Sequence, residues 1–243
     1  MTRPAAAGRA AAAVTAAVLA GHVVPAATWL PRLRRVCFPS LAGIGRPDHV
    51  ALTFDDGPDP RSTAAFLDVL DALDTKATFF VLGESLARAR HLGREIAARG
   101  HELAVHGWTH EPRLLPAPVA EAAAIARTAA AVENLAGAPP LWYRPPFGVL
   151  TGDRLLAARA AGLRPVLWSA WGRDWTAAAT PASVLAATRA DLRGGGTVLL
   201  HDSDSRSAPG CWRATLAALP ALVAGCRSAG LAVGPLREHG IGR

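Results

Sequence analysis

Short apolar runs alternate with longer stretches rich in Ala, Leu and Arg along most of this chain. The apolar runs have the length and the Gly, Pro or polar boundaries of strands, and the stretches between them are long enough for helices. The expected strands are 49–54, 77–82, 102–106, 142–144, 164–169, 197–201 and 231–233, and the expected helices are 62–73, 85–99, 118–135, 152–161, 181–192 and 212–229. Alternation of strands with helices predicts an α/β fold with a parallel sheet, and this many units favour its closure into a barrel.

The composition agrees with one folded domain of moderate size. The chain has 243 residues, of which 51% are hydrophobic and 19% charged, which is enough apolar material for a substantial core. This balance excludes a disordered chain and a small disulfide scaffold. The 19 Pro and 23 Gly follow no fixed period, so collagen-like and solenoid architectures are also excluded.

The positive charge of the chain is concentrated near its N-terminus. The formal net charge is +7, but residues 1–46 hold six of the 26 basic residues and no acidic one. The remainder, 47–243, therefore carries 20 basic and 19 acidic residues and is nearly neutral. A basic groove is not indicated, and we expect no nucleic-acid partner.

An uncharged run covers residues 10–30, close to the roughly 20 residues that a helix needs to cross a bilayer. The run is mostly Ala and contains His22 and Pro25, and the segment Val24-Pro25-Ala26 has the small-x-small form of a signal-peptidase site. Three interpretations stay open: a signal anchor, a cleaved signal peptide and an Ala-rich soluble helix. The first two predict a cell-surface or secreted protein, with possible membrane association through this run, and the third leaves the cytoplasm open.

The three cysteines, Cys37, Cys211 and Cys226, are too few and too scattered for a structural zinc knuckle. In an oxidising compartment Cys211 and Cys226 could form one disulfide. Three reduced, buried thiols are the alternative.

Polar residues follow the expected strands at the edge where parallel α/β folds carry their sites. Asp55 and Asp56 leave the first strand together, and two adjacent carboxylates oppose each other's ionisation unless a cation lies nearby. A metal site or an acidic turn that caps the next helix explains the pair.

Two histidines, His106 and His110, follow the third strand, four residues apart. On a helical turn this spacing places both imidazoles on one face, where they can share one ion. Surface or core histidines with local hydrogen bonds are the alternative. Together with Asp56 the pair makes a two-His, one-carboxylate set that leaves coordination positions for water and substrate.

Two further polar residues stand at strand ends. Arg144 precedes two prolines, which hold it in extended conformation, and a fixed arginine can clamp a carboxylate. A surface arginine before a turn is the alternative. His201 ends the sixth strand, where an apolar segment meets solvent, and this is a suitable place for a proton donor.

Five motifs in sequence order carry a resemblance to a known family. They are Thr53-Phe54-Asp55-Asp56-Gly57-Pro58, His106 to His110, Arg144-Pro145-Pro146-Phe147-Gly148, Asp174-Trp175 and Leu199-Leu200-His201-Asp202. Over roughly residues 48–235 this series closely resembles the polysaccharide deacetylases (NodB homology, carbohydrate esterase family 4). The resemblance implies a distorted (β/α) barrel of about seven parallel strands, preceded here by an N-terminal apolar helix. It also implies a divalent metal, usually Zn²⁺ with Co²⁺ or another divalent ion as alternatives, and hydrolysis of acetyl groups from an acetylated polysaccharide.

The family's roles can be carried over residue by residue. Asp56, His106 and His110 would hold the metal, and Asp55 would be the general base that activates the attacking water. Arg144 would orient Asp55, and His201 would protonate the departing amine. Trp175, Trp108 and Phe147 would form the wall of the acetyl pocket, and a backbone N–H near Phe147 would help stabilise the oxyanion.

The chain departs from the family pattern at two positions. Gly107 replaces the usual Ser or Thr after the first motif histidine, so a supporting hydrogen bond is in doubt. Trp171 replaces an Asp that is thought to pair with the acid histidine in the family. Asp174 and Asp202 are therefore the candidate partners of His201.

The leading hypothesis is a metal-dependent deacetylase of N-acetylglucosamine polysaccharide, such as peptidoglycan or a chitin-like glycan. In it, residues 1–46 are an anchor or signal segment plus linker and residues 47–243 are the catalytic domain. Two alternatives stay open: an esterase that removes O-acetyl groups from xylan or cell-wall sugars, and a catalytically impaired glycan-binding protein. Retention of the complete polar set at the strand ends favours an enzyme.

Overall fold

The computed structural model describes residues 3–112 and 115–242. Eight strands are distributed through this part of the chain: β1 His49–Asp55, β2 Thr78–Val81, β3 Glu102–Val105, β4 Trp142–Tyr143, β5 Arg164–Pro165, β6 Ala170–Trp171, β7 Thr197–His201 and β8 Ala232–Gly234. The helices between and around them are α1 Arg3–Val23, α2 Pro31–Cys37, α3 Thr63–Ala72, α4 Gly83–Arg88, α5 Arg90–Ala98, α6 Pro118–Ala136, α7 Gly152–Ala160, α8 Pro181–Asp191 and α9 Trp212–Ser228. The 3-10 helices are η1 Val24–Trp29, η2 Pro146–Gly148 and η3 Leu236–Glu238.

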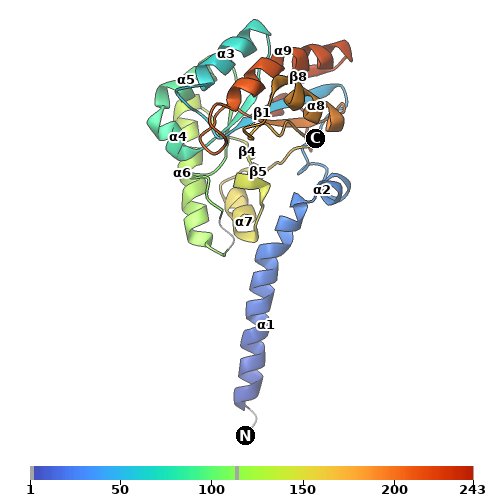
Figure 1. Cartoon of the computed structure of the whole chain (residues 1–243). Helices are drawn as coiled ribbons and strands as arrows, with labels where there is room; N and C mark the ends of the chain where they lie inside the picture. The colour runs from blue at the N-terminus through green and yellow to red at the C-terminus, as the bar shows by residue number, and fades with distance from the viewer. Residues whose placement is uncertain (1–2, 113–114, 243) are drawn as a thin grey trace.

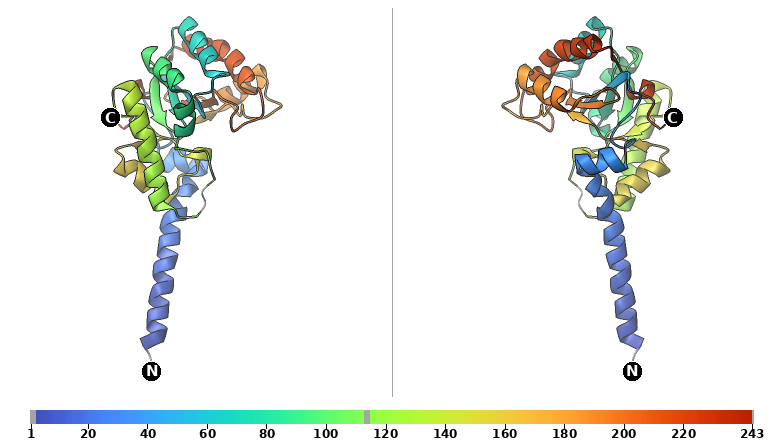
Figure 2. Two further views of the ribbon diagram at one scale, coloured as in Figure 1. Left: turned by 90° about the vertical axis from the view of Figure 1, so that its left-hand side faces the viewer. Right: turned by 90° about the vertical axis from the view of Figure 1, so that its right-hand side faces the viewer.

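The strands form one parallel sheet in the order β5-β4-β3-β2-β1-β7-β6, and β8 pairs with the beginning of β1. The sheet curves into a half-barrel, with the helices on its outside (Figures 1 and 2). This confirms the α/β fold with about seven parallel strands. The register places Asp55 opposite His201, so the last residues of the central strands β1 and β7 lie side by side.

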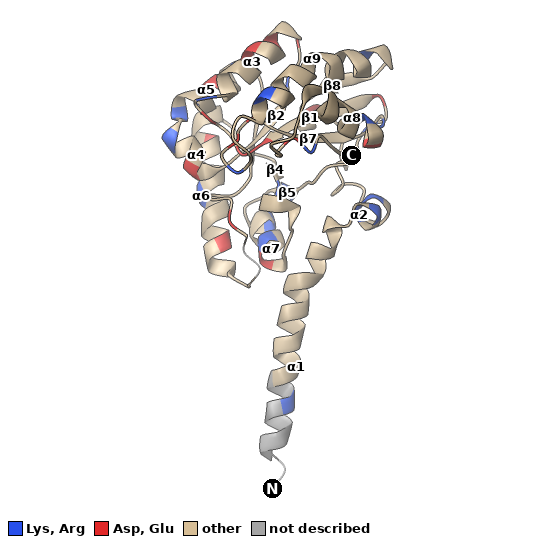
Figure 3. Cartoon of the chain, in the orientation of Figure 1, with Lys and Arg blue, Asp and Glu red and all other residues tan. Residues whose placement is uncertain are grey.

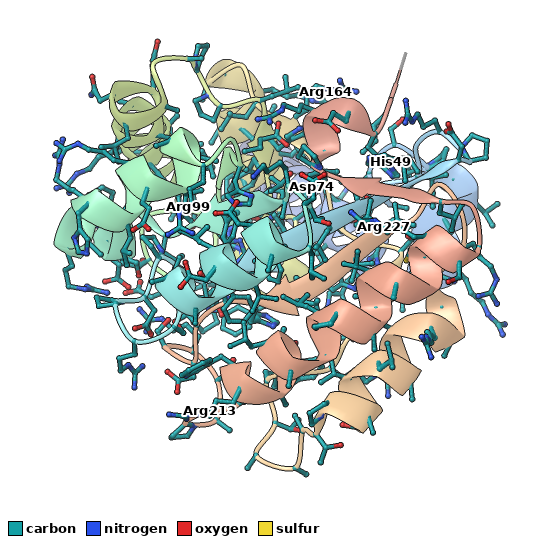
Figure 4. The ribbon with its side chains drawn as sticks, turned by 90° about the horizontal axis from the view of Figure 1, so that it is seen from above. His49, Asp74, Arg99, Arg164, Arg213 and Arg227 are labelled. Atoms are coloured by element: carbon teal, nitrogen blue, oxygen red, sulfur yellow. The ribbon has the colours of Figure 1, made fainter. Side chains whose placement is uncertain are left out.

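The outer helices follow one another around the sheet. Contacts run from α8 to α9, from α9 to α3, from α3 to α5, from α5 to α6 and from α6 to α7. The main core lies between the sheet and these helices and includes Phe54, Phe66 and Leu219, all fully buried. Seen from above, Arg227 near the end of α9 reaches the loop after α3, where it donates a hydrogen bond to the carbonyl of Asp74 (3.0 Å; Figure 4).

The expected strand 164–169 is mostly irregular, and two distant arginines supply the reason. Only Arg164 and Pro165 pair with β4, whereas the chain re-enters the sheet at β6, an element that the sequence did not indicate. Arg144 donates to the carbonyls of residues 166 and 167, and Arg34 donates to that of residue 168. These carbonyls therefore bond to side chains instead of a neighbouring strand. The expected helix 85–99 also differs, because it divides into α4 and α5 at Ala89.

The N-terminal apolar helix is present, and it ends before the uncharged run does. The α-helix ends at Val23 and Pro25 lies in the first turn of the 3-10 helix η1. Proline has no backbone N–H and therefore cannot continue an α-helical hydrogen-bond ladder. By length and composition, one helical stretch of the described chain, Ala12–Trp29, is apolar enough to cross a membrane, with mean hydropathy 1.4 and 11% of it buried. The helix α1 projects from the domain, and the half of α1 next to the domain carries no Lys, Arg, Asp or Glu (Figure 3).

The cysteines are all free thiols in the described chain, so the disulfide alternative is wrong for this structure. The alternative of three buried thiols holds for Cys211 and Cys226 but is wrong for Cys37, which is exposed. Cys211 precedes the first residue of α9 and Cys226 lies near its other end. Fifteen residues of helix separate them by roughly 22 Å, far beyond the Cα separation of a disulfide.

Candidate active site

A pocket of about 450 Å³ opens at the carboxyl ends of the central strands. Its lining combines polar side chains at the strand ends with a group of aromatic ones: Trp29, Asp55, Asp56, His106, His110, Phe147, Gly148, Val149, Trp168, Trp171, Trp175, Leu199, His201, Arg206 and Ser207. The polar residues come from the last positions of β1 and β7 and from the segments that follow β1, β3 and β7. Parallel pairing brings these ends to one edge, as the strand-end pattern predicted.

The two adjacent aspartates both face this pocket although they are neighbours in sequence. Successive side chains of a strand point to opposite faces, which would separate Asp55 from Asp56. Asp56 follows the last residue of β1 and takes a positive φ of 77°, an uncommon conformation for a residue with a side chain. This turn ends the alternation, so both carboxylates are buried in the same site.

Asp56, His106 and His110 form a compact group whose ligand atoms all lie within 4.8 Å of one another. The Nε2 atoms of both histidines lie 3.5 Å from Oδ1 of Asp56, and this buried oxygen has no hydrogen-bond partner. The Nδ1 atom of His106 lies 2.8 Å from the backbone carbonyl of Arg144, which can accept a hydrogen bond from Nδ1–H. In that tautomer the lone pair of Nε2 is available to coordinate a metal. The donor set therefore fits a divalent transition metal such as zinc.

Protonation also favours a ligand role for this group. Burial raises the pKa of Asp56, but the neighbouring imidazoles outweigh it and hold the pKa well below its usual range. Burial and the charge of His106 lower the pKa of His110 to about 4 against the opposing effect of Asp56. At neutral pH the site thus presents a carboxylate and an uncharged imidazole, as metal binding requires.

The histidine pair does not lie on a helical turn, as its spacing suggested. The chain bends at residues 108–109 after β3, and Gly107 just before the bend has a φ of 108°, a value that glycine adopts without strain. The imidazoles meet because the chain reverses between them, with their ring centroids 5.2 Å apart.

Arg144 is completely buried and forms an ion pair with Asp55. Its Nη1 atom donates to Oδ1 of Asp55 at 2.7 Å and to Oγ1 of Thr53 at 2.8 Å. The guanidinium also lies 4.0 Å from the centre of the Phe80 ring. The other oxygen of Asp55 stays directed at the histidines, 3.9 Å from Nε2 of His106.

His201 pairs with Asp174, which decides between the two candidate partners. Nδ1 of His201 lies 2.8 Å from Oδ1 of Asp174, whose other oxygen accepts hydrogen bonds from the backbone N–H of His201 and from the hydroxyl of Thr215. Asp202 instead accepts a hydrogen bond from Thr63. Burial would lower the pKa of His201, but Asp174, followed by the pocket aspartates, raises it to about 10.

Aromatic rings form much of the pocket wall. Phe147 packs against His110 with ring centroids 4.2 Å apart, and Trp175 stacks on Trp171 at 4.4 Å. Trp108 is not among the lining residues. It lies under the guanidinium of Arg127, 3.5 Å from the ring centre, in a separate depression between α4 and α6.

Sequence reasoning missed five lining residues: Trp29, Val149, Trp168, Arg206 and Ser207. None of them stands in a strand-end motif, and Trp29 belongs to the N-terminal apolar run. Its only signal was a large aromatic side chain among small residues.

A family model described as polysaccharide deacetylase matches residues 42–166, about half of the chain. The chain belongs to this family. The matched region contains the aspartate pair, the histidine pair and Arg144, whereas His201 and Asp174 lie beyond it.

Individual relatives agree with this assignment. A chitooligosaccharide deacetylase of Bradyrhizobium sp. (strain ANU 289) is 41% identical over 155 residues, which cover 63% of this chain and 70% of the relative. A peptidoglycan-N-acetylglucosamine deacetylase of Bacillus cereus is 38% identical over 128 residues, covering 52% of this chain and 46% of the relative. A solved peptidoglycan N-acetylglucosamine deacetylase superposes with a TM-score of 0.74 at 27% identity, over 81% of this chain and 90% of that one. These relatives are hydrolases that act on carbon–nitrogen bonds.

Trp171 is one of the two positions at which the sequence departs from the expected motif pattern. His201 still has a carboxylate partner, because it pairs with Asp174, three residues after Trp171. The indole at 171 adds a ring to the pocket wall beside Trp168 and Trp175.

Proposed function

We propose that this protein is a metal-dependent hydrolase that removes N-acetyl groups from N-acetylglucosamine-type polysaccharide, peptidoglycan or a chitin-like glycan. The observation that carries the proposal is the Asp56–His106–His110 set, of which Asp56 and His106 are buried. Asp55 and His201 line the same pocket and lie outside that set. The names of the relatives supply the substrate class.

In the proposed site, Asp56, His106 and His110 hold the metal, with Zn²⁺ as the expected ion and Co²⁺ as an alternative. A divalent ion there would supply Lewis acidity, which polarises the acetyl carbonyl and makes the attacking water more acidic. Asp55, oriented by Arg144, takes a proton from that water as its oxygen attacks the carbonyl carbon.

The carbon–nitrogen bond then breaks, and the amine nitrogen must gain a proton to leave. His201 is the proposed donor, because Asp174 holds its ring and keeps it protonated over a wide pH range. The products are acetate and a free amine on the sugar. Phe147, Trp171 and Trp175 exclude bulk water from the acetyl group.

Removal of the metal is expected to abolish turnover. After chelation, acetate release from N-acetylglucosamine oligomers should fall at least about 100-fold, and Zn²⁺ or Co²⁺ should restore it. His106→Ala should lose both metal content, measured by elemental analysis, and activity. The matched control is His91→Ala, an exposed histidine on α5, which should keep both.

Full activity in the chelated protein, with metal at background level, would show that the mechanism is wrong. Faster acetate release from acetylated xylan than from N-acetylglucosamine oligomers would show that the protein is an O-acetyl esterase instead.

Asp174→Asn is expected to move the alkaline limb of the pH–rate profile. His201 serves as an acid only when protonated, so activity falls as the pH rises through its pKa. Asp174 raises that pKa, so the uncharged variant should lose activity at a pH lower by about one unit or more. The profile of kcat/KM against pH measures the shift, and Asp48→Asn, at an exposed position, is the control. An unchanged alkaline limb would contradict the assignment of His201.

We also propose that α1 anchors the protein at the cell surface, with residues 1–46 as anchor plus linker and residues 47–243 as the catalytic domain. The apolar stretch Ala12–Trp29 and the peptidoglycan-directed relatives support this placement. Fractionation of cells that express the tagged full chain, with and without residues 1–23, tests it.

A further inference from the structure

A second, larger cavity lies beside the catalytic pocket, and its lining is mainly apolar. Its volume is about 890 Å³, and it lies between the N-terminal segment, the helix α7 and the strands β4 and β5. Its walls include apolar side chains from the N-terminal segment, Val24, Leu33 and Phe38, and from the domain, Leu150, Leu155 and Leu163. Cavities of this size and character hold ligands in many proteins.

The apolar cavity and the catalytic pocket share two walls, each one chain segment thick. In the first wall, Thr28 lines the apolar cavity and the next residue, Trp29, lines the catalytic pocket. In the second, Val149 lines the catalytic pocket and Leu150 lines the apolar cavity. Because both spaces also open to solvent, an elongated molecule can occupy both by passing over the rim of one of these walls.

A buried arginine fixes the first wall in place. Arg34 is only 2% exposed, and its Nη1 atom donates to the carbonyls of Thr28 (2.9 Å) and Trp29 (3.2 Å). Its Nη2 atom donates to the carbonyl of Trp168, a residue of the catalytic pocket, at 2.8 Å. Arg34 thus holds the part of the N-terminal segment that follows α1 against the catalytic pocket.

Both spaces lie where the apolar helix meets the domain. The stretch that is apolar enough to cross a membrane ends at Trp29. Leu30 and Val36, just beyond it, are exposed, and α1 projects from the same end of the domain (Figure 1). A hydrocarbon chain held in a bilayer can therefore reach the apolar cavity while a polar group attached to it enters the catalytic pocket.

We propose that the substrate is an N-acetylated saccharide joined to a long hydrocarbon chain, which binds with its sugar in the catalytic pocket and its chain in the apolar cavity. This inference rests on the proposed N-deacetylase function and narrows its substrate to a membrane-held glycan. The apolar lining stabilises the chain, because each buried methylene contributes roughly fourfold in affinity.

The test compares acetate release from one N-acetylglucosamine oligosaccharide and from its dodecyl glycoside, with the full chain in bilayer nanodiscs. The dodecyl glycoside should have a kcat/KM at least about tenfold higher than that of the free oligosaccharide.

Leu155→Gln and Leu33→Gln, in the apolar cavity, should bring the ratio of these two kcat/KM values close to one. Leu156→Gln, the adjacent residue on α7 with 67% exposure, is the matched control and should keep the ratio. Partition of the glycoside into the bilayer raises the ratio equally in all variants, so the difference between Leu155→Gln and Leu156→Gln decides.

Other results would overturn the inference in distinguishable ways. A ratio near one in the wild type, with the free oligosaccharide still hydrolysed, refutes the chain site but leaves the deacetylase proposal intact. An equal ratio in Leu155→Gln and Leu156→Gln also refutes it. No acetate from either substrate refutes the deacetylase proposal; calorimetry with the dodecyl glycoside then tests the cavity alone, and binding no tighter than that of the free sugar refutes the chain site. If dodecyl phosphocholine, which lacks the sugar, binds as tightly and Leu155→Gln weakens it, the cavity holds a bilayer lipid. A dimer that Leu155→Gln dissociates would show that a second copy covers the cavity.

Discussion

Asp55→Asn is expected to lower kcat by about 10²- to 10⁴-fold while the protein keeps its metal. The variant retains an oxygen for Arg144 but cannot accept a proton from water. Asp55 lies outside the compact ligand set, with its nearer oxygen 3.9 Å from Nε2 of His106. Acetate release and metal content should be measured on the same sample.

Asp56→Asn is the matched control for this experiment, because it changes the adjacent carboxylate in the same way. It should lose metal as well as activity, since Oδ1 of Asp56 lies 3.5 Å from both histidines. If Asp55→Asn lost its metal and Asp56→Asn kept it, the roles of the two aspartates would be reversed.

His201→Gln is expected to slow the hydrolysis of an N-acetyl oligosaccharide by about 10²- to 10³-fold and that of an activated acetate ester by less than about tenfold. An amine needs a proton to leave, whereas the leaving group of an activated ester departs as a weakly basic anion. Parallel assays of both substrates at one pH measure the two losses.

The exposed His91→Gln is the control for this pair of assays and should leave both rates unchanged. An equal, modest loss on both substrates would assign His201 a structural role within its contact to Asp174. The amine would then take its proton from another group.

Local sequence pattern was sufficient to predict most of the strands and helices and the positions of the polar residues at the strand ends. Apolar runs such as that of β7 have strand length and end at a polar residue, so their bounds could be predicted, and residues 197–201 were predicted without error. In a parallel sheet the ends of such strands meet at one edge. This rule predicts that Asp55, Asp56 and His201 lie close together.

Contacts between segments that are distant in sequence are visible only in the folded structure. Trp29 reaches the pocket because Arg34, buried against Trp168, holds the N-terminal segment there. Trp108 follows His106 closely, yet it packs under Arg127 outside the pocket. Periodicity reports which face of an element is apolar, but not which other segment that face will meet.

The same limit explains the two local errors at the site. Residues 164–169 have the composition of a strand, but side chains of Arg34 and Arg144 satisfy the backbone carbonyls that a neighbouring strand would need. The spacing of His106 and His110 fits a helical turn, but the chain bends there just after Gly107. In both cases the surrounding fold outweighed a local pattern. The free energy of a local conformational preference is small beside the cost of leaving a buried polar group without a hydrogen-bond partner.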